Sequence, residues 1–158
     1  AGHSTTIYNG EAVKLSSGYV VGGQGSAADI IGVLNGIFYN DASTLKPTFA
    51  NFYKATITPA NSEDTTAFVM DDPFQLYVVA ADTATGVATF LETYDMNTTS
   101  GDDTTGKSDA TLDIGTTSQD GKQFRMLRSA EDPENEDATA VRHSVIVVSN
   151  LNSFNGHN

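Results

Sequence analysis

One stretch of the sequence matches a motif with known chemistry. Gly101-Asp-Asp-Thr-Thr-Gly-Lys-Ser108 satisfies G-x-x-x-x-G-K-[ST], the phosphate-binding loop of nucleotide hydrolases. That loop requires a buried strand before it and a helix after it, because the N-terminal amides of the helix face the phosphates. Here the largely polar residues 96–100 precede the motif, and residues 109–115 read as strand and turn. Asp102 and Asp103 would also repel a phosphate, so we interpret the segment as a surface loop.

The histidines and carboxylates show no second catalytic pattern. His3, His143 and His157 lack the i, i+4 spacing of helical metal ligands. The acidic pair before Pro73 lies on a tight turn, whereas a glycosidase needs two carboxyls across a sugar-sized cleft. The G-x-S-x-G element of serine hydrolases is missing from the sequence. We therefore expect no catalytic residues, no metal ligands and no cofactor, and we expect that the protein is not an enzyme.

Charge and composition exclude several classes of partner. The 158 residues carry 20 acidic side chains against 8 lysines and arginines, a net charge of −12. Nucleic acids and anionic membranes select for positive charge, so neither is expected as a partner. The chain has no cysteine, which excludes disulfides and thiolate metal sites. It has no apolar run near ~18 residues, so no membrane-spanning helix is expected.

Short apolar segments alternate with Gly-, Asn-, Asp- and Pro-rich turns along the whole chain. The segments expected as strands are 12–15, 19–21, 30–39, 65–70, 74–81, 111–114, 123–127 and 140–150, and residues 88–94 read as strand or short helix. Polar stretches at 95–109 and 130–139 are expected as loops. The predicted fold is all-β, a single-domain sandwich or barrel of seven to nine short antiparallel strands with long polar loops.

Two segments carry the side chains that we expect to bind a partner. The first is an extended N-terminal arm, residues 1–15, ahead of a β domain at 16–158; its apolar set is too small to offset its own ordering cost. The second, residues 47–57, holds aromatic side chains that either pack as a satellite core or anchor a partner. The candidate partner-binding residues are Ile7, Tyr8, Val13, Lys14, Leu15, Phe49, Phe52 and Tyr53.

Several weak motifs follow one another through nearly the whole chain. They are V-K-L at 13–15, G-V-x-x-G-[IV]-x-Y-x-D at 32–41, aromatic residues at 49–53, A-x-V-x-D-D-P at 67–73, T-G-x-S-x-x-x-L-D at 105–113, the segment 124–127, and a closing stretch of the V-x-V-x-N type at 146–150. In this order they resemble a family of tailed-bacteriophage virion proteins, the head decoration (cement) proteins encoded beside the major capsid protein. The closing stretch departs from the family, because it lacks the N-x-H that follows there.

This resemblance implies a structural role. Such a protein binds the outside of the phage capsid and stabilises the lattice of the major capsid protein, its partner. It is located on the virion exterior, and in the host cytoplasm during assembly. The family also implies a homo-oligomer: we expect a trimer, because cement proteins often occupy three-fold positions, with a dimer as the alternative. An extended arm that adds a strand to a neighbouring sheet is the expected mode of binding.

Two other functions stay open. The first is a carbohydrate-binding or adhesin-like β module, to which Thr-, Asn- and Asp-rich loops and tyrosines are suited. Its Ca²⁺-dependent form would use oxygen ligands from 95–97 and 102–103, although the EF-hand spacing is absent. The second is a nucleotide hydrolase, which rests on residues 101–108 alone.

Overall fold

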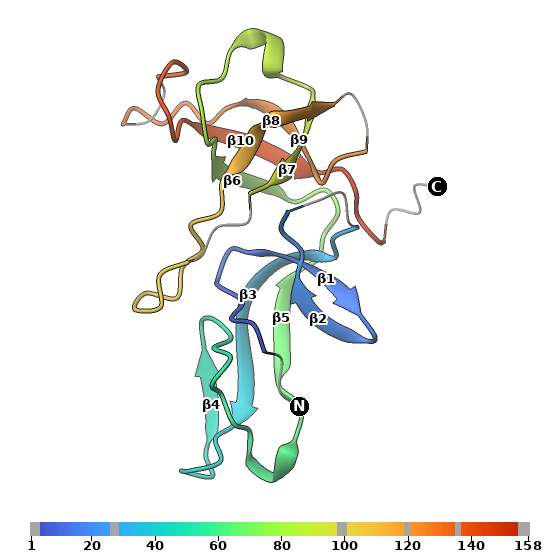
Figure 1. Cartoon of the computed structure of the whole chain (residues 1–158), viewed down its shortest axis with the longest axis vertical. Helices are drawn as coiled ribbons and strands as arrows, with labels where there is room; N and C mark the ends of the chain where they lie inside the picture. The colour runs from blue at the N-terminus through green and yellow to red at the C-terminus, as the bar shows by residue number, and fades with distance from the viewer. Residues whose placement is uncertain (1–3, 26–28, 98–100, 119–120, 135–136, 155–158) are drawn as a thin grey trace.

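The computed structural model describes residues 4–25, 29–97, 101–118, 121–134 and 137–154, and within these ranges the chain is all-β. Ten strands form two antiparallel sheets, and the only helices there are two 3₁₀ turns, η1 (Ala60–Ser62) and η2 (Val87–Thr89). The sheets lie one above the other along the long axis (Figure 1). The predicted fold class is confirmed, with one strand more than the upper expectation. Among the described residues there is no helix long and apolar enough to cross a membrane.

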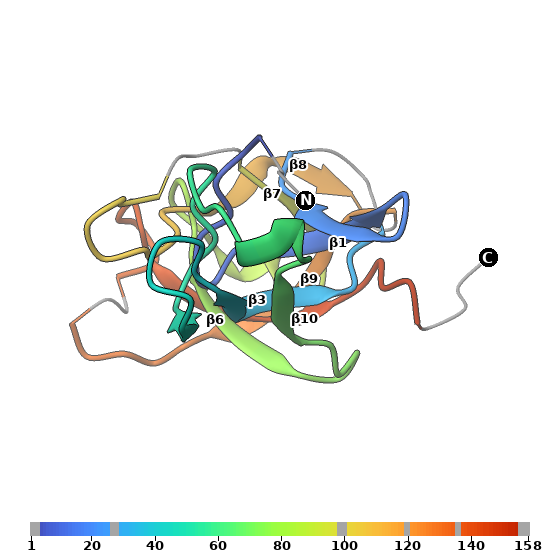
Figure 2. The ribbon, with the colours of Figure 1, turned by 90° about the horizontal axis from the view of Figure 1, so that it is seen from below.

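The lower sheet is organised around β3. It contains β1 (Ala12–Ser16), β2 (Tyr19–Gly22), β3 (Gly32–Asn40), β4 (Pro47–Ala50) and β5 (Thr66–Met70). β5 pairs with β3 along one edge, while β1 and β4 pair with opposite ends of its other edge. Seen from below, β3 crosses the middle of the molecule in front of the upper sheet (Figure 2). β3 therefore has neighbours on both edges and two faces available for packing.

The upper sheet curls on itself. Its order is β6-β10-β9-β7-β8, formed by β6 (Leu76–Ala80), β7 (Thr93–Met96), β8 (Leu112–Ser118), β9 (Phe124–Ser129) and β10 (Ser144–Ser149). A bridge between Ala81 and Leu112 brings the two ends of this order together, and Asp82 N donates to Leu112 O at 3.0 Å. The strand that the sequence predicts at 140–150 corresponds to β10, which covers only 144–149. Val141 lies outside β10 and is exposed.

The turn at 71–75 carries the chain from one sheet to the other. Asp72 Oδ1 accepts a hydrogen bond from Phe74 N at 2.9 Å, as expected for an Asx turn before a second strand. β5 and β6, which flank this turn, belong to different sheets. The sequence identified the turn correctly, and the tertiary structure uses it as a crossover.

Two hydrophobic clusters form the core. The upper cluster is built by Tyr94, Met96, Leu112, Phe124, Met126, Val145 and Val147, and it is joined by Ala12, Ile30 and Val33 from the lower part of the chain. The lower cluster, on one face of β3, comprises Ile7, Val13, Ile31, Leu34, Ile37 and Tyr53. Because β1 and the start of β3 contribute to both clusters, the two sheets share one continuous interior.

Gln123 joins the two sheets through hydrogen bonds. Its side chain is fully buried, its Nε2 donates to Gly23 O, and its Oε1 accepts from Met96 N at 3.0 Å. Gly23 follows β2 of the lower sheet, while Met96 ends β7 of the upper sheet. One amide group therefore satisfies backbone atoms of both sheets, at a place that water does not reach.

The expectation of an N-terminal arm is wrong for the described part, residues 4–15. Ile7 exchanges two backbone hydrogen bonds of 2.9 Å with Tyr53, and Ala12 and Val13 pair with β3. Ile7 and Val13 are buried in the lower cluster. The pairing partners of Ile7, Ala12 and Val13 lie 19 to 46 positions later in the chain, and the local sequence does not reveal such partners.

We predict that Gln123→Leu lowers the free energy of unfolding by about 2–4 kcal/mol, because it leaves the Gly23 carbonyl and the Met96 amide buried without partners. Urea denaturation measures this difference. The matched control is Gln75→Leu, since Gln75 is exposed and a surface change away from such contacts stays within about 0.5 kcal/mol. Equal stability of the two variants would contradict the role of Gln123.

We predict that Glu11→Gln stabilises the protein at pH 7 and leaves it unchanged below about pH 4. Burial raises the pKa of the Glu11 carboxyl above its usual range, although the hydrogen bond from Tyr8 N to Oε2 opposes this. When folding raises the pKa of a carboxyl, the folded protein loses stability as the pH rises from the unfolded-state pKa to the folded-state pKa. A glutamine does not ionise, so the variant does not lose stability in this range. Melting temperatures across pH 3–8 test the prediction; a difference independent of pH contradicts it.

Candidate partner-binding surface

The structure divides the eight predicted partner-binding residues by exposure. Three are buried in the lower cluster: Ile7, Val13 and Tyr53. Three are half-buried: Tyr8, Lys14 and Phe52. Two are exposed: Leu15 and Phe49. Val13 is fully buried and offers no surface to a partner in the folded chain, whereas Ile7 and Tyr53 keep a small exposed fraction where they line a groove of the lower sheet.

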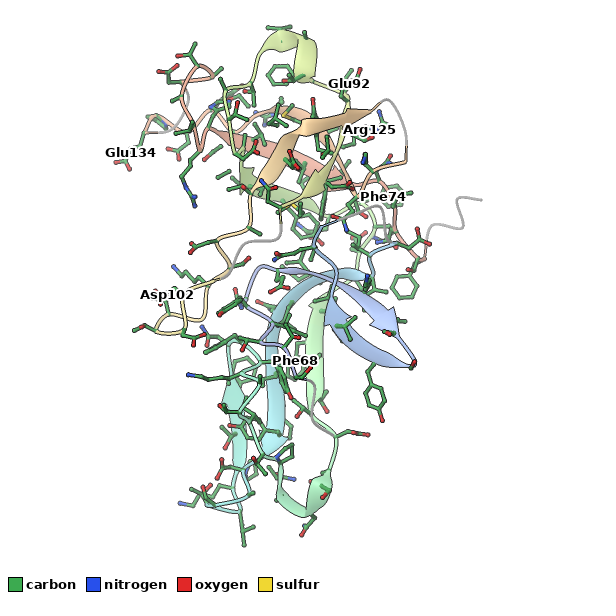
Figure 3. The ribbon with its side chains drawn as sticks, viewed as in Figure 1. Phe68, Phe74, Glu92, Asp102, Arg125 and Glu134 are labelled. Carbon is green, nitrogen blue, oxygen red and sulfur yellow. The ribbon has the colours of Figure 1, made fainter. Side chains whose placement is uncertain are left out.

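Phe49 belongs to an exposed apolar face of the lower sheet. Phe38 is its direct cross-strand partner on β3, and the Phe49 and Phe68 rings are 5.8 Å apart between centroids, tilted by 43°. Met70 follows Phe68 at i+2 on β5, so both side chains point to the same side. We call Phe38, Phe49, Phe68 and Met70 the phenylalanine face. Phe38, Phe49 and Phe68 are 38, 63 and 45 % exposed, and Figure 3 labels Phe68 on the lower sheet.

Gly36 allows this face to form. A Cβ on Gly36 would lie 2.7 Å from Phe49 Cζ and 3.1 Å from Ala50 O, and its φ is +138°. The β3–β5 register also shifts between Leu34 and Gly36, as a β-bulge does. The Phe49 ring therefore lies directly over the β3 backbone and reaches Phe68 on the far strand, which no side chain at position 36 would permit.

A second aromatic pair holds a loop in place. The rings of Tyr8 and Phe52 are stacked at 5.8 Å with an interplanar angle of 4°. Tyr8 Oη donates to Asp103 Oδ1 at 2.8 Å, and this hydrogen bond is the main reason that the pKa of Tyr8 is raised. A Cβ on Gly101 would collide with the Tyr8 ring, and one on Gly106 with the Phe52 ring. The two half-buried aromatic residues thus position the loop at 101–107.

The same loop cannot act as a phosphate cradle. Its amides are already used: those of Asp102, Gly106 and Ser108 donate to the carbonyl oxygens of Lys107, Asp102 and Asn9, at 2.7–2.9 Å. The next element is the strand β8, where a nucleotide site requires a helix. The two glycines that match the phosphate-binding motif serve instead to let the loop approach the aromatic rings.

The carboxylates proposed as Ca²⁺ ligands have other partners. Asp95 is buried and forms an ion pair of 2.8 Å with Lys122. Asp102 accepts hydrogen bonds from Thr104 N and Thr105 Oγ1 of its own loop, which lower its pKa. In the part of the chain that the structure describes, no three histidine or acidic side chains gather as a metal site would require.

Asp41 fixes the connection that places β4. Its Oδ1 accepts the amides of Ser43 and Thr44, each at 2.9 Å, and the Ser43 hydroxyl at 2.5 Å. These hydrogen bonds, led by that of the Ser43 hydroxyl, lower the pKa of Asp41 to about 2. The turn between β3 and β4 therefore keeps its charged cap at any pH above that value, and with it the alignment of Phe38 with Phe49.

Sequence reasoning found Phe49 but missed Phe38, Phe68 and Met70. The alternation over 66–70 already indicated that Phe68 and Met70 share a side of a strand. It could not show which side faces the core. That depends on the register of β3 against β4 and β5, which is a long-range property.

Comparison of the chain with protein-family models, with curated proteins and with solved structures found no match in any of the three.

We predict that Gly36→Ala lowers the free energy of unfolding by about 1–3 kcal/mol, because alanine at φ +138° is strained and its Cβ displaces the Phe49 ring. Thermal or urea unfolding measures it. Gly86→Ala is the control: a Cβ at Gly86 meets nothing within 4 Å, and its φ of −145° suits any residue. If Gly36→Ala were as stable as Gly86→Ala, the close approach of Phe49 would not exist.

Proposed function

We propose that this chain is a virion structural protein that binds the outside of a phage capsid and stabilises the lattice of the major capsid protein through the phenylalanine face. The observation that carries the proposal is the exposed cluster of Phe38, Phe49 and Phe68 on three adjacent strands. Apolar patches of this kind mark protein-binding surfaces, in which a few aromatic side chains supply most of the binding energy. The order of motifs along the sequence supports the choice of a capsid as the partner.

The charge distribution also supports protein docking at this face. The chain has a net charge of −12, yet the register positions on this side of the three strands carry only uncharged residues. They are Phe38, Asn40, Pro47, Phe49, Thr66, Phe68 and Met70. Interface centres are depleted of charge in the same way, and these positions bring no charged side chain of their own to a docked partner.

The alternative of a carbohydrate-binding module finds less support at this surface. A sugar-binding site combines an aromatic side chain with precisely placed polar groups that fix the orientation of the ligand. Phenylalanine and methionine side chains donate and accept no strong hydrogen bonds. The phenylalanine face therefore suits an apolar protein surface better than a polyhydroxylated ligand.

A binding experiment with variant pairs tests the proposal. Shells assembled from a tailed-phage major capsid protein, taken from the genome that encodes this chain, are mixed with the wild-type protein, with Phe49→Ser/Phe68→Ser, or with the control Phe74→Ser, and sedimented. Phe74 is 79 % exposed but lies outside the phenylalanine face, higher up in Figure 3. We expect the double variant to lose at least about tenfold in affinity, because each buried aromatic anchor contributes about 2 kcal/mol.

Each outcome of this experiment is informative. Wild-type protein that stays in the supernatant would overturn the proposed function, and a glycan-array signal from the same protein would then favour the carbohydrate-binding alternative. Wild-type affinity of the double variant would show that another surface binds the shell. The proposed homo-oligomer, a trimer or a dimer, is measured separately by light scattering of the free protein.

A further inference from the structure

A groove of about 550 Å³ opens on the lower sheet, on the opposite side of β3 from the phenylalanine face. Its floor is apolar and is formed by Ile7, Leu34, Ile37, Tyr53 and Ala67. One wall is formed by residues 16 and 18–21 of the β1–β2 pair, and the other by residues 64 and 65 just before β5, next to Ala67 of the floor. The groove therefore has an apolar floor between two strands.

β2 presents an unpaired backbone edge to the groove. Within the described part of the chain it pairs with β1 alone, and the Gly23 amide donates to Ala12 O at 2.8 Å in continuation of that ladder. Antiparallel hydrogen bonds alternate along a strand, so Tyr19 and Val21 bond to β1 as Gly23 does. The N–H and C=O of Val20 consequently point away from β1. Consecutive residues 18–21 line the groove, as expected when the edge of a strand faces it.

The two walls of the groove determine which kind of partner structure it can bind. The edge of another folded sheet would bring a second strand behind the first, whereas this groove is bounded on the side opposite β2 by residues 64, 65 and 67. A single extended segment avoids this conflict, since its backbone can bond to Val20 while alternate side chains enter the apolar floor. Such addition of a strand to a free edge is a common way for a folded domain to capture a peptide segment.

The charge around the groove indicates which side chains a bound segment can carry. Asp64 lies at the rim of the groove, the chain as a whole carries a charge of −12, and the floor residues are uncharged. A segment with apolar residues at alternate positions and a lysine or arginine beside them matches all three features. A segment with acidic flanks would be repelled.

We propose that this groove binds an extended segment of the major capsid protein, which adds a strand to the β2 edge at Val20 and places alternate apolar side chains on the floor. This inference rests on the proposed function, and it adds a second contact on the face of β3 opposite the phenylalanine face. Two contacts on opposite faces would let one protein hold two neighbouring pieces of the lattice together.

The test is a matched pair of proline substitutions at strand edges. Val20→Pro removes the outward amide of β2 without removing a hydrogen bond to β1, since proline is tolerated at such edge positions. Val78→Pro is the control on β6, the edge strand of the upper sheet. There the Ala81 amide donates to His143 O, so by alternation the Val78 amide also points away from its neighbour β10. Val78 is 69 % exposed and lies outside the groove.

Co-sedimentation with assembled shells is the first measurement. We expect Val20→Pro to bind at least tenfold more weakly than wild type and Val78→Pro to bind as wild type does. Thermal unfolding of both variants shows whether each is folded. Wild-type binding by a folded Val20→Pro overturns the inference.

Hydrogen exchange of the wild-type protein is the second measurement, and it does not depend on any variant. Mass spectrometry of the peptide that contains β2 compares free protein with shell-bound protein. We expect its outward amides to exchange fast when free and to be protected when bound. Unchanged fast exchange in sedimented, shell-bound protein overturns the groove proposal while the proposed function stands. Failure of the wild-type protein to sediment overturns both.

Discussion

The arrangement of the two sheets depends on one buried amide. Gln123 accepts from the backbone of β7 and donates to the residue after β2, inside an interior that excludes water. The backbone of Gln123 also accepts the amides of Asn150 and Leu151, just after β10. One residue thus ties together three distant parts of the chain. Apolar packing alone is not directional, whereas these hydrogen bonds, together with that from Gly25 N to Met96 O, favour one relative placement of the sheets.

With the two sheets placed in this way, the two faces of β3 have different roles. Its inner side chains complete the lower cluster, while its outer face carries Phe38 and supports Phe49. The bulge before Gly36 and the missing side chain at that position allow both faces to be well packed. Glycine in the middle of a strand is normally a weakness, and here it is what brings aromatic rings from three strands into contact.

The two proposed contact surfaces share an electrostatic property. Both the phenylalanine face and the floor of the groove are uncharged in a chain of net charge −12. The negative charge is carried instead by loops, for example at Asp102 and Asp103, where local hydrogen bonds hold the carboxylates. This separation places the charge on the loops and leaves two apolar surfaces able to dock.

The sequence by itself determined the all-β class, the approximate positions of many strands and the turn before Pro73, because alternation and turn residues are local properties. It could not decide between Val13 and Leu15, or between Tyr53 and Phe49, as the exposed member of each pair. Nor did it show that residues 7–13 are held by Tyr53 and β3. Exposure depends on which distant strand lies opposite a residue and in which register, and only the packed tertiary structure sets that register.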